Sequence, residues 1–126
     1  DQLAERGLIA MLEPFLSSRV NGKVRNDLSP DAVIKSIHMC QGLGATSAYT
    51  WMKLPVVDEM DRVMESTTMP TLLLGGDPTD PEEAFASWEK ALSLPSVRGL
   101  IVGRTLLYPP DDDVSSAVAT AVAMVR

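Results

Sequence analysis

Residues 48–55 read Ala-Tyr-Thr-Trp-Met-Lys-Leu-Pro, and this stretch decides the fold that the sequence predicts. Its first five residues are mostly aromatic, β-branched or apolar, which favours a strand. A lysine, Lys53, follows them directly. A helix is predicted next, over residues 58–65, because its apolar side chains recur at helical spacing. The stretch therefore predicts a strand that carries a lysine at its end and then continues into a helix.

The same order, a strand and then a helix, is predicted four times along the chain. The first predicted strand is an almost unbroken apolar run, typical of a strand that is buried on both faces. The four predicted strands cover residues 8–12, 48–52, 71–74 and 99–102. Because alternating strands and helices form a parallel sheet covered by helices, we expect a single α/β domain over residues 1–126. Four such units fit either part of a doubly wound sheet or half of an eight-fold barrel.

Capping sequences mark where the helices begin. Ser29-Pro30-Asp31 supplies a capping serine, a proline at the first helical position and an acid in the first turn. Asp80-Pro81-Glu82-Glu83 is a similar start. The helix that begins near Pro30 is expected to end at Gly42 or Gly44. Residues 17–23, which precede it, are expected to form a polar loop.

Composition excludes several classes of protein. The net charge of -6 argues against a nucleic-acid binder, which needs a basic surface for phosphates. No apolar run approaches the roughly 20 residues that span a membrane. The single cysteine, Cys40, forms no internal disulfide, and no export signal is present, so we expect a cytoplasmic protein. No metal site and no cofactor are expected. The chain does not begin with Met, which is compatible with a fragment or a processed product.

Two charged residues at predicted strand ends are the candidate catalytic groups. Lys53 continues an apolar strand, and burial of a lysine frees its amine as a nucleophile toward carbonyls. The iminium so formed draws electrons from a neighbouring carbon–carbon bond. Glu13 follows the first strand and can exchange protons with such a site. Each also has a plainer reading: a lysine whose head reaches solvent, and a carboxylate that only forms an ion pair with it.

Glycines and an arginine follow the other two predicted strands. Gly75-Gly76 ends the third strand, and Gly103-Arg104 ends the fourth. Glycine lets backbone N–H groups approach an anion, and a guanidinium forms forked hydrogen bonds with phosphate. We therefore expect Gly75, Gly76, Gly103 and Arg104 to bind the phosphate of a substrate. The plainer reading is that the glycines form tight turns and that Arg104 pairs with an acid.

These stretches resemble the class I, Schiff-base aldolase superfamily. The similarity is to tagatose-bisphosphate and deoxyribose-phosphate aldolases, and most of all to an actinobacterial deoxyribose-phosphate-aldolase-like family. It rests on Glu13-Pro14, Ser47–Pro55 with Lys53-Leu54-Pro55-Val56, Leu73-Leu74-Gly75-Gly76-Asp77-Pro78 and Gly103–Pro109. The resemblance implies that the chain is the C-terminal half, strands 5 to 8, of a (β/α)8 (TIM) barrel. It also implies that Lys53 is the Schiff-base lysine, that Glu13 is the acid–base group, and that the two glycine loops bind phosphate.

The leading expectation is therefore an aldolase, a carbon–carbon lyase that cleaves a phosphorylated sugar or keto acid through a lysine imine. Two alternatives stay open: a non-catalytic or truncated half-barrel that binds a phosphorylated metabolite, and a barrel isomerase that forms no imine. Open sheet edges and an uncovered apolar face would invite another chain. The expected partner is a second copy or the missing N-terminal half-barrel.

Overall fold

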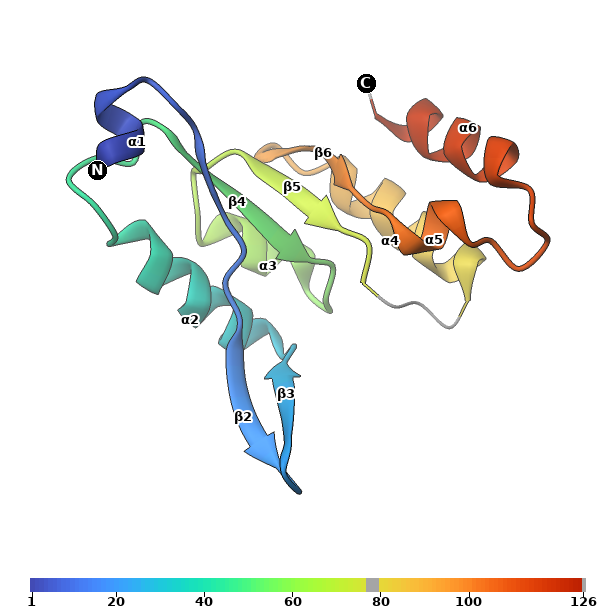
Figure 1. The fold of residues 1–126 in the computed structure, drawn as a ribbon, viewed down its shortest axis with the longest axis horizontal. Helices are drawn as coiled ribbons and strands as arrows, with labels where there is room; N and C mark the ends of the chain where they lie inside the picture. The colour runs from blue at the N-terminus through green and yellow to red at the C-terminus, as the bar shows by residue number, and fades with distance from the viewer. Residues whose placement is uncertain (77–79, 126) are drawn as a thin grey trace.

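A four-stranded parallel sheet forms the centre of the computed structural model, which describes residues 1–76 and 80–125. Its strands are β1 (Ala10–Leu12), β4 (Thr50–Pro55), β5 (Thr71–Leu74) and β6 (Val97–Ile101), and they lie side by side in that order (Figure 1). Every neighbouring pair in the sheet is parallel. Each strand therefore lies beside the sheet strand that precedes it in the chain.

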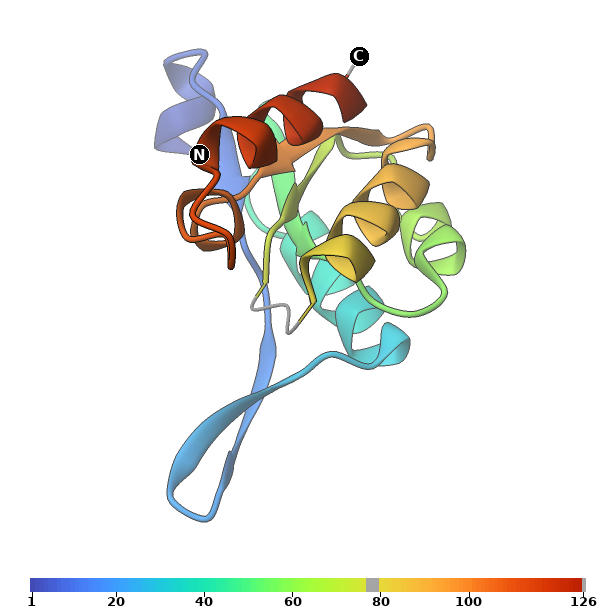
Figure 2. The same cartoon turned by 90° about the vertical axis from the view of Figure 1, so that its right-hand side faces the viewer.

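Helices connect the strands and cover the sheet. The long ones are α2 (Pro30–Gln41), α4 (Pro81–Leu92) and α6 (Val114–Met124), and the shorter ones are α1 (Gln2–Glu5), α3 (Met60–Glu65) and α5 (Arg104–Leu107). Figure 2 shows α2 in cyan, α3 in green and α4 in yellow on the same side of the sheet. Helix α6 packs beside α4, with the small residues Ala117 and Ala121 buried. Among the described helices, none combines the length and apolar character that crossing a membrane requires.

The hydrophobic core lies between the sheet and the helices on this side. Met52, Leu54 and Leu73 project from the strands and are completely buried. They pack in one cluster with Ile37 of α2 and Val63 of α3. Because side chains alternate between the two faces of a strand, the residues between them face the other way. Those residues include Lys53 and Leu72, which are partners in the β4–β5 register and are partly exposed.

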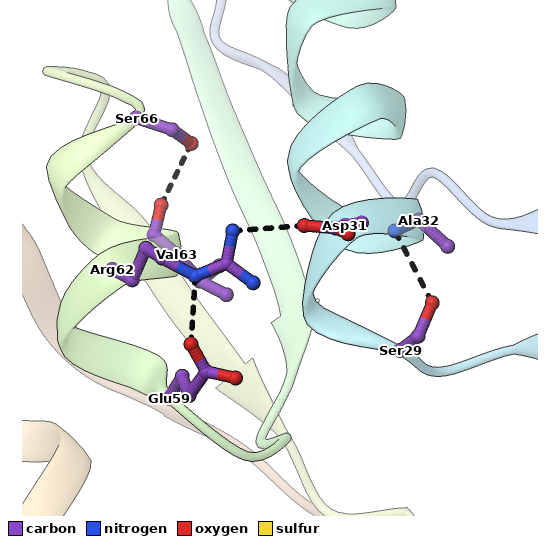
Figure 3. Close-up of polar contacts among 7 residues, drawn as sticks. All are labelled: Ser29, Asp31, Ala32, Glu59, Arg62, Val63 and Ser66. Carbon is purple, nitrogen blue, oxygen red and sulfur yellow. Dashed lines mark hydrogen bonds and ion pairs between the residues drawn. The ribbon is translucent and has the colours of Figure 1, made fainter.

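Helices α2 and α4 begin at the two capping sequences, as predicted. Ser29 accepts a hydrogen bond from the backbone N–H of Ala32 at the start of α2, and Asp80 accepts one from Glu82 at the start of α4. Figure 3 shows a further tie between helices, in which Arg62 of α3 donates to Asp31 of α2 and to Glu59, each at 2.8 Å. These ion pairs raise the pKa of the Arg62 guanidinium, chiefly through the bond to Asp31. The bridge links α3 to the first turn of α2 at the surface.

The prediction of a polar loop at residues 17–23 is wrong. The chain forms two antiparallel strands there, β2 (Leu16–Val20) and β3 (Lys23–Asp27), joined by Asn21-Gly22. Both turn residues have positive φ, at 49° and 77°, as a tight hairpin turn requires. Figures 1 and 2 show this hairpin extending away from the sheet and its helices. We call residues 16–27 the hairpin arm.

The α/β prediction is confirmed, but the prediction of a half-barrel is wrong. The structure is a small α/β domain with an open four-stranded sheet, in which β1 and β6 are the two edges. Strand β1 is also only three residues long, because residues 8 and 9 do not join the expected strand. Alternation of strands and helices predicts a parallel sheet but does not distinguish a closed sheet from an open one.

Candidate functional site

The structure brings Lys53 and Glu13 into direct contact. The Lys53 Nζ atom donates to Glu13 Oε2 at 2.9 Å, across 40 positions of sequence. Lys53 lies inside β4, two residues before its end, rather than just after the strand as the sequence indicated. Its side chain is 24% exposed and that of Glu13 is 42% exposed. The pair is thus partly shielded but open to a small molecule.

Sheet register explains why these two residues meet. Leu12 of β1 pairs with Met52 of β4, so the next residues along each strand lie side by side. Both then face the side of the sheet opposite Met52 and the core. The contact follows from the parallel pairing of β1 with β4 and needs no special loop conformation. An exposed ion pair of this kind contributes about 0–1 kcal/mol to stability, so the fold itself depends little on it.

A cavity of about 480 Å³ opens beside this pair, at the carboxyl end of the sheet. Glu13 lines it from the position just after β1, Pro55 from the end of β4 and Leu74 from the end of β5. Helix α4 contributes Trp88, a residue that is 2% exposed. Lys53 does not line the cavity, but its partner Glu13 does. The ion pair therefore lies at the edge of a space large enough for a small metabolite.

The expected phosphate loops lie around the same cavity. Gly75, Gly76 and Arg104 line it, and an Arg104 guanidinium nitrogen lies 3.5 Å from the backbone oxygen of Gly76. A Cβ atom at Gly75 would lie 2.9 Å from the Cγ1 of Val102, so the glycine allows two strand ends to approach closely. Gly76 has a φ of 64°, which favours glycine. Three of the four expected phosphate-binding residues therefore share one cavity with Glu13.

Gly103 differs from the other three. It precedes the four-residue helix α5 and does not line the cavity. No atom lies within 4 Å of the place where its Cβ would be, so close approach does not explain this glycine. Asp77 and Pro78, which belong to the stretch that carried the family resemblance, lie outside the described residues. Within the described part of the chain, no group of three or more acidic, histidine or cysteine side chains could hold a metal ion.

Sequence reasoning missed the part of the cavity that comes from the hairpin arm and its flanks. Phe15, Asn26 and Leu28 line the cavity opposite α4. The sequence did not predict these residues as part of the site, because it predicted residues 17–23 to form a loop. The dipeptide Asn21-Gly22 was the available signal, since it is a strong indication of a two-residue hairpin turn. A hairpin there returns the chain to the site at Asn26.

Comparison with known proteins gives the family. Residues 1–122 match the family model described as Cgl0159-like. The chain belongs to the Cgl0159-like family. The crystal structure of Cgl0159 from Corynebacterium glutamicum is similar to it, with 66% sequence identity and a TM-score of 0.95. The match covers 98% of this chain but 42% of the solved chain, so this chain spans less than half the length of that relative. Among curated proteins, none matches the chain.

These matches overturn the resemblance to the class I aldolase superfamily, including its tagatose-bisphosphate, deoxyribose-phosphate and actinobacterial branches. The matching family is Cgl0159-like and not an aldolase family. The stretches behind the resemblance are at most nine residues long, and each lies around the end of an apolar strand. Any parallel α/β sheet places glycines and charged residues where its strands end, because the chain must turn and meet solvent there. Such motifs do not identify a family.

Proposed function

We propose that this Cgl0159-like protein is a carbon–carbon lyase that forms an imine between Lys53 and the carbonyl of a phosphorylated sugar or keto acid. The observation that carries the proposal is the 2.9 Å contact between Lys53 and Glu13 beside the cavity. The proposal rests on these residues and not on membership of an aldolase superfamily. No cofactor enters the reaction. We further propose that the protein acts in the cytoplasm.

Glu13 gives the lysine a route to its reactive form. An ammonium group has no free electron pair, so it must lose a proton before it attacks a carbonyl carbon. The Glu13 carboxylate is within hydrogen-bond distance of Nζ and can accept that proton. The amine then adds to the carbonyl, the carbonyl oxygen leaves as water, and the iminium remains. Glu13, which gives its proton to the departing water, then accepts the proton of the substrate hydroxyl on the carbon β to the iminium carbon. That carbon leaves as an aldehyde, and the electron pair of the broken carbon–carbon bond passes to the iminium nitrogen. Glu13 returns the proton to the resulting enamine, and hydrolysis releases the second carbonyl product and restores the lysine.

The rest of the cavity fits a phosphorylated substrate. Arg104 lines it and supplies a positive charge, and Gly75 and Gly76 expose backbone beside it. Trp88 and Leu74 add apolar walls that exclude water from part of the space. The solved relative is more than twice as long as the matched segment. The proposal therefore includes further groups, from the rest of the full-length protein, that complete this site.

The same ion pair favours a second candidate, a non-catalytic domain that binds a phosphorylated metabolite. A lysine held by a carboxylate at 2.9 Å can serve as a fixed positive charge with no covalent step. In that case Lys53 and Arg104 would both contact the anion, and Glu13 would only orient Lys53. The two candidates differ in one measurable step, which is formation of the imine.

Borohydride trapping distinguishes them. The full-length protein is incubated with dihydroxyacetone phosphate or pyruvate as probe carbonyls, reduced with borohydride, and digested for mass spectrometry. We expect a stable adduct on Lys53, none in Lys53→Arg because a guanidinium does not form the imine, and a normal adduct in the surface control Lys90→Arg. Absence of any adduct on Lys53 with saturating probe would leave the binding domain as the better description.

A further inference from the structure

The hairpin arm has features that a free surface loop does not need. Every residue from 17 to 27 is exposed, so the arm has almost no packing of its own against the core. An isolated two-stranded hairpin is only marginally stable in water. Both of its strands also leave an edge unpaired, and each edge is a template for another chain. The arm thus gains order when something packs against it.

The charge of the arm is opposite to that of the rest of the chain. It carries Arg19, Lys23 and Arg25 against one carboxylate, Asp27, in a chain whose net charge is -6. Cross-strand pairing puts Lys23 beside Val20 and Arg19 beside Val24, so each face of the tip carries a cation next to a valine. Within the described residues, none of the three cations forms an ion pair. The tip is therefore a positively charged surface with two exposed valines.

A groove of opposite charge, with apolar walls, lies elsewhere on the molecule. It has a volume of about 460 Å³ and runs between the start of α4 and the start of α6. Four carboxylates line it: Asp80, Glu82, Asp111 and Asp113. Apolar walls come from Phe85 and from the prolines at 109 and 110. In the part of the chain that the structure describes, none of the four carboxylates forms an ion pair.

We propose that the hairpin arm of one copy docks into the groove between α4 and α6 of a second copy of this chain. The cations of the arm meet the four carboxylates, and Val20 and Val24 pack against Phe85 and the prolines. The occupant of the groove is a second copy because the arm is a basic projection, with two exposed valines, of an otherwise acidic chain. A reciprocal exchange of arms gives a two-fold dimer, and a one-way contact gives a ring where the rotation closes and a filament where it does not.

This contact also reaches the proposed active site, although it does not depend on the proposed function. The arm begins three residues after Glu13, and Asn26 near its end lines the cavity beside Lys53 and Glu13. Ser17 donates to Asn26 across the two strands at 2.7 Å, which ties the base of the arm together. Docking of the tip on a neighbour therefore holds one wall of the cavity in place.

Charge reversal tests the proposal in the full-length protein. Analytical ultracentrifugation measures self-association of the wild type and of Lys23→Glu/Arg25→Glu at low and high salt. The control Lys35→Glu/Lys90→Glu makes the same change in net charge on exposed helix positions. We expect the arm variant to weaken association at least tenfold relative to the control, and added salt to weaken the wild type, because salt screens exposed charges.

A charge swap identifies the docking surface. Glu82→Lys/Asp111→Lys cancels the charge of the groove, leaving two negative and two positive groups, while it keeps Asp80 and Asp113, the residues that cap α4 and α6. This variant should associate as poorly as the arm variant. A mixture of the two should associate more strongly than either variant alone, because the unchanged arm of one meets the unchanged groove of the other. The proposal is overturned by a monomeric wild type at low salt, by an arm variant that associates like the control, or by a mixture that does not recover. In the last case the arm docks somewhere other than the groove.

Discussion

Replacement of Gly75 by alanine tests how the strand ends are packed at the cavity. An ideal Cβ at this position would lie 2.9 Å from the Cγ1 and 3.1 Å from the Cβ of Val102. Carbon atoms in contact prefer separations of about 3.5–4.0 Å. A rotation of the valine side chain can move its Cγ1 but not its Cβ, so the two strand ends must also shift apart. Such overpacking costs about 1–3 kcal/mol.

A smaller effect opposes this cost. Alanine restricts the unfolded chain more than glycine does, which stabilises the folded state by about 0.4–1 kcal/mol. The two terms together predict a loss of about 1–2 kcal/mol in the free energy of unfolding for Gly75→Ala. Urea denaturation of the full-length protein measures it as a lower midpoint with an unchanged slope.

Two companion variants show whether Val102 is the cause. Gly103→Ala is the matched control, because no atom lies within 4 Å of its Cβ position and its φ is -130°. It should be more stable than the wild type by about 0.4–1 kcal/mol, because only the effect on the unfolded chain remains. Gly75→Ala/Val102→Ala removes the nearer clash, so the double variant should be more stable than the sum of the two single changes predicts. Gly75→Ala and Gly103→Ala with equal stability would refute the reasoning.

The remaining predictions concern the ion pair, the arginine and the arm. Glu13→Gln should reduce kcat roughly 10²–10⁴-fold in steady-state assays while some borohydride adduct on Lys53 survives, and an unchanged kcat would show that Glu13 is not the proton carrier. Arg104→Ala should weaken binding of dihydroxyacetone phosphate about tenfold or more but leave binding of dihydroxyacetone unchanged in calorimetry, whereas equal losses on both would assign Arg104 a structural role. The backbone N–H of Ser29, and then its side chain, hold the pKa of Asp27 below its ordinary value. The stability from Asp27 is therefore present above the ordinary carboxyl pKa and lost as the pH falls through the lowered one, so acid unfolding followed by circular dichroism should be less steep in Asp27→Asn than in the wild type.

Local sequence signals predicted the elements whose physics is local. The caps at Ser29 and Asp80 placed the starts of α2 and α4, because a short polar side chain before a proline satisfies free backbone N–H groups wherever it occurs. Apolar runs located the four sheet strands to within a few residues. The hairpin arm was missed because its strands are polar and do not alternate clearly, so the turn residues Asn21-Gly22 were the only strong signal.

The candidate site was only partly predictable for a different reason. Which strands are neighbours decides which side chains meet, and a single sequence does not contain that information directly. Lys53 and Glu13 could each be chosen as charged residues near strand ends, but their contact depends on the pairing of β1 with β4. The motifs did not show whether the sheet closes into a barrel or to which family the chain belongs. A short motif at a strand end is shared by many α/β proteins.

The strand order of the sheet has a consequence for how the protein is made. Strands β1, β4, β5 and β6 join the sheet in the order in which a ribosome releases them. Each new strand and its helix can therefore dock on an edge that is already present, and no strand has to insert between two others. This order keeps the sequence separation between paired strands as small as the same strands and connections allow, which lowers the entropic cost of closing each loop. The domain is thus suited to assembly during synthesis, one strand–helix unit after another.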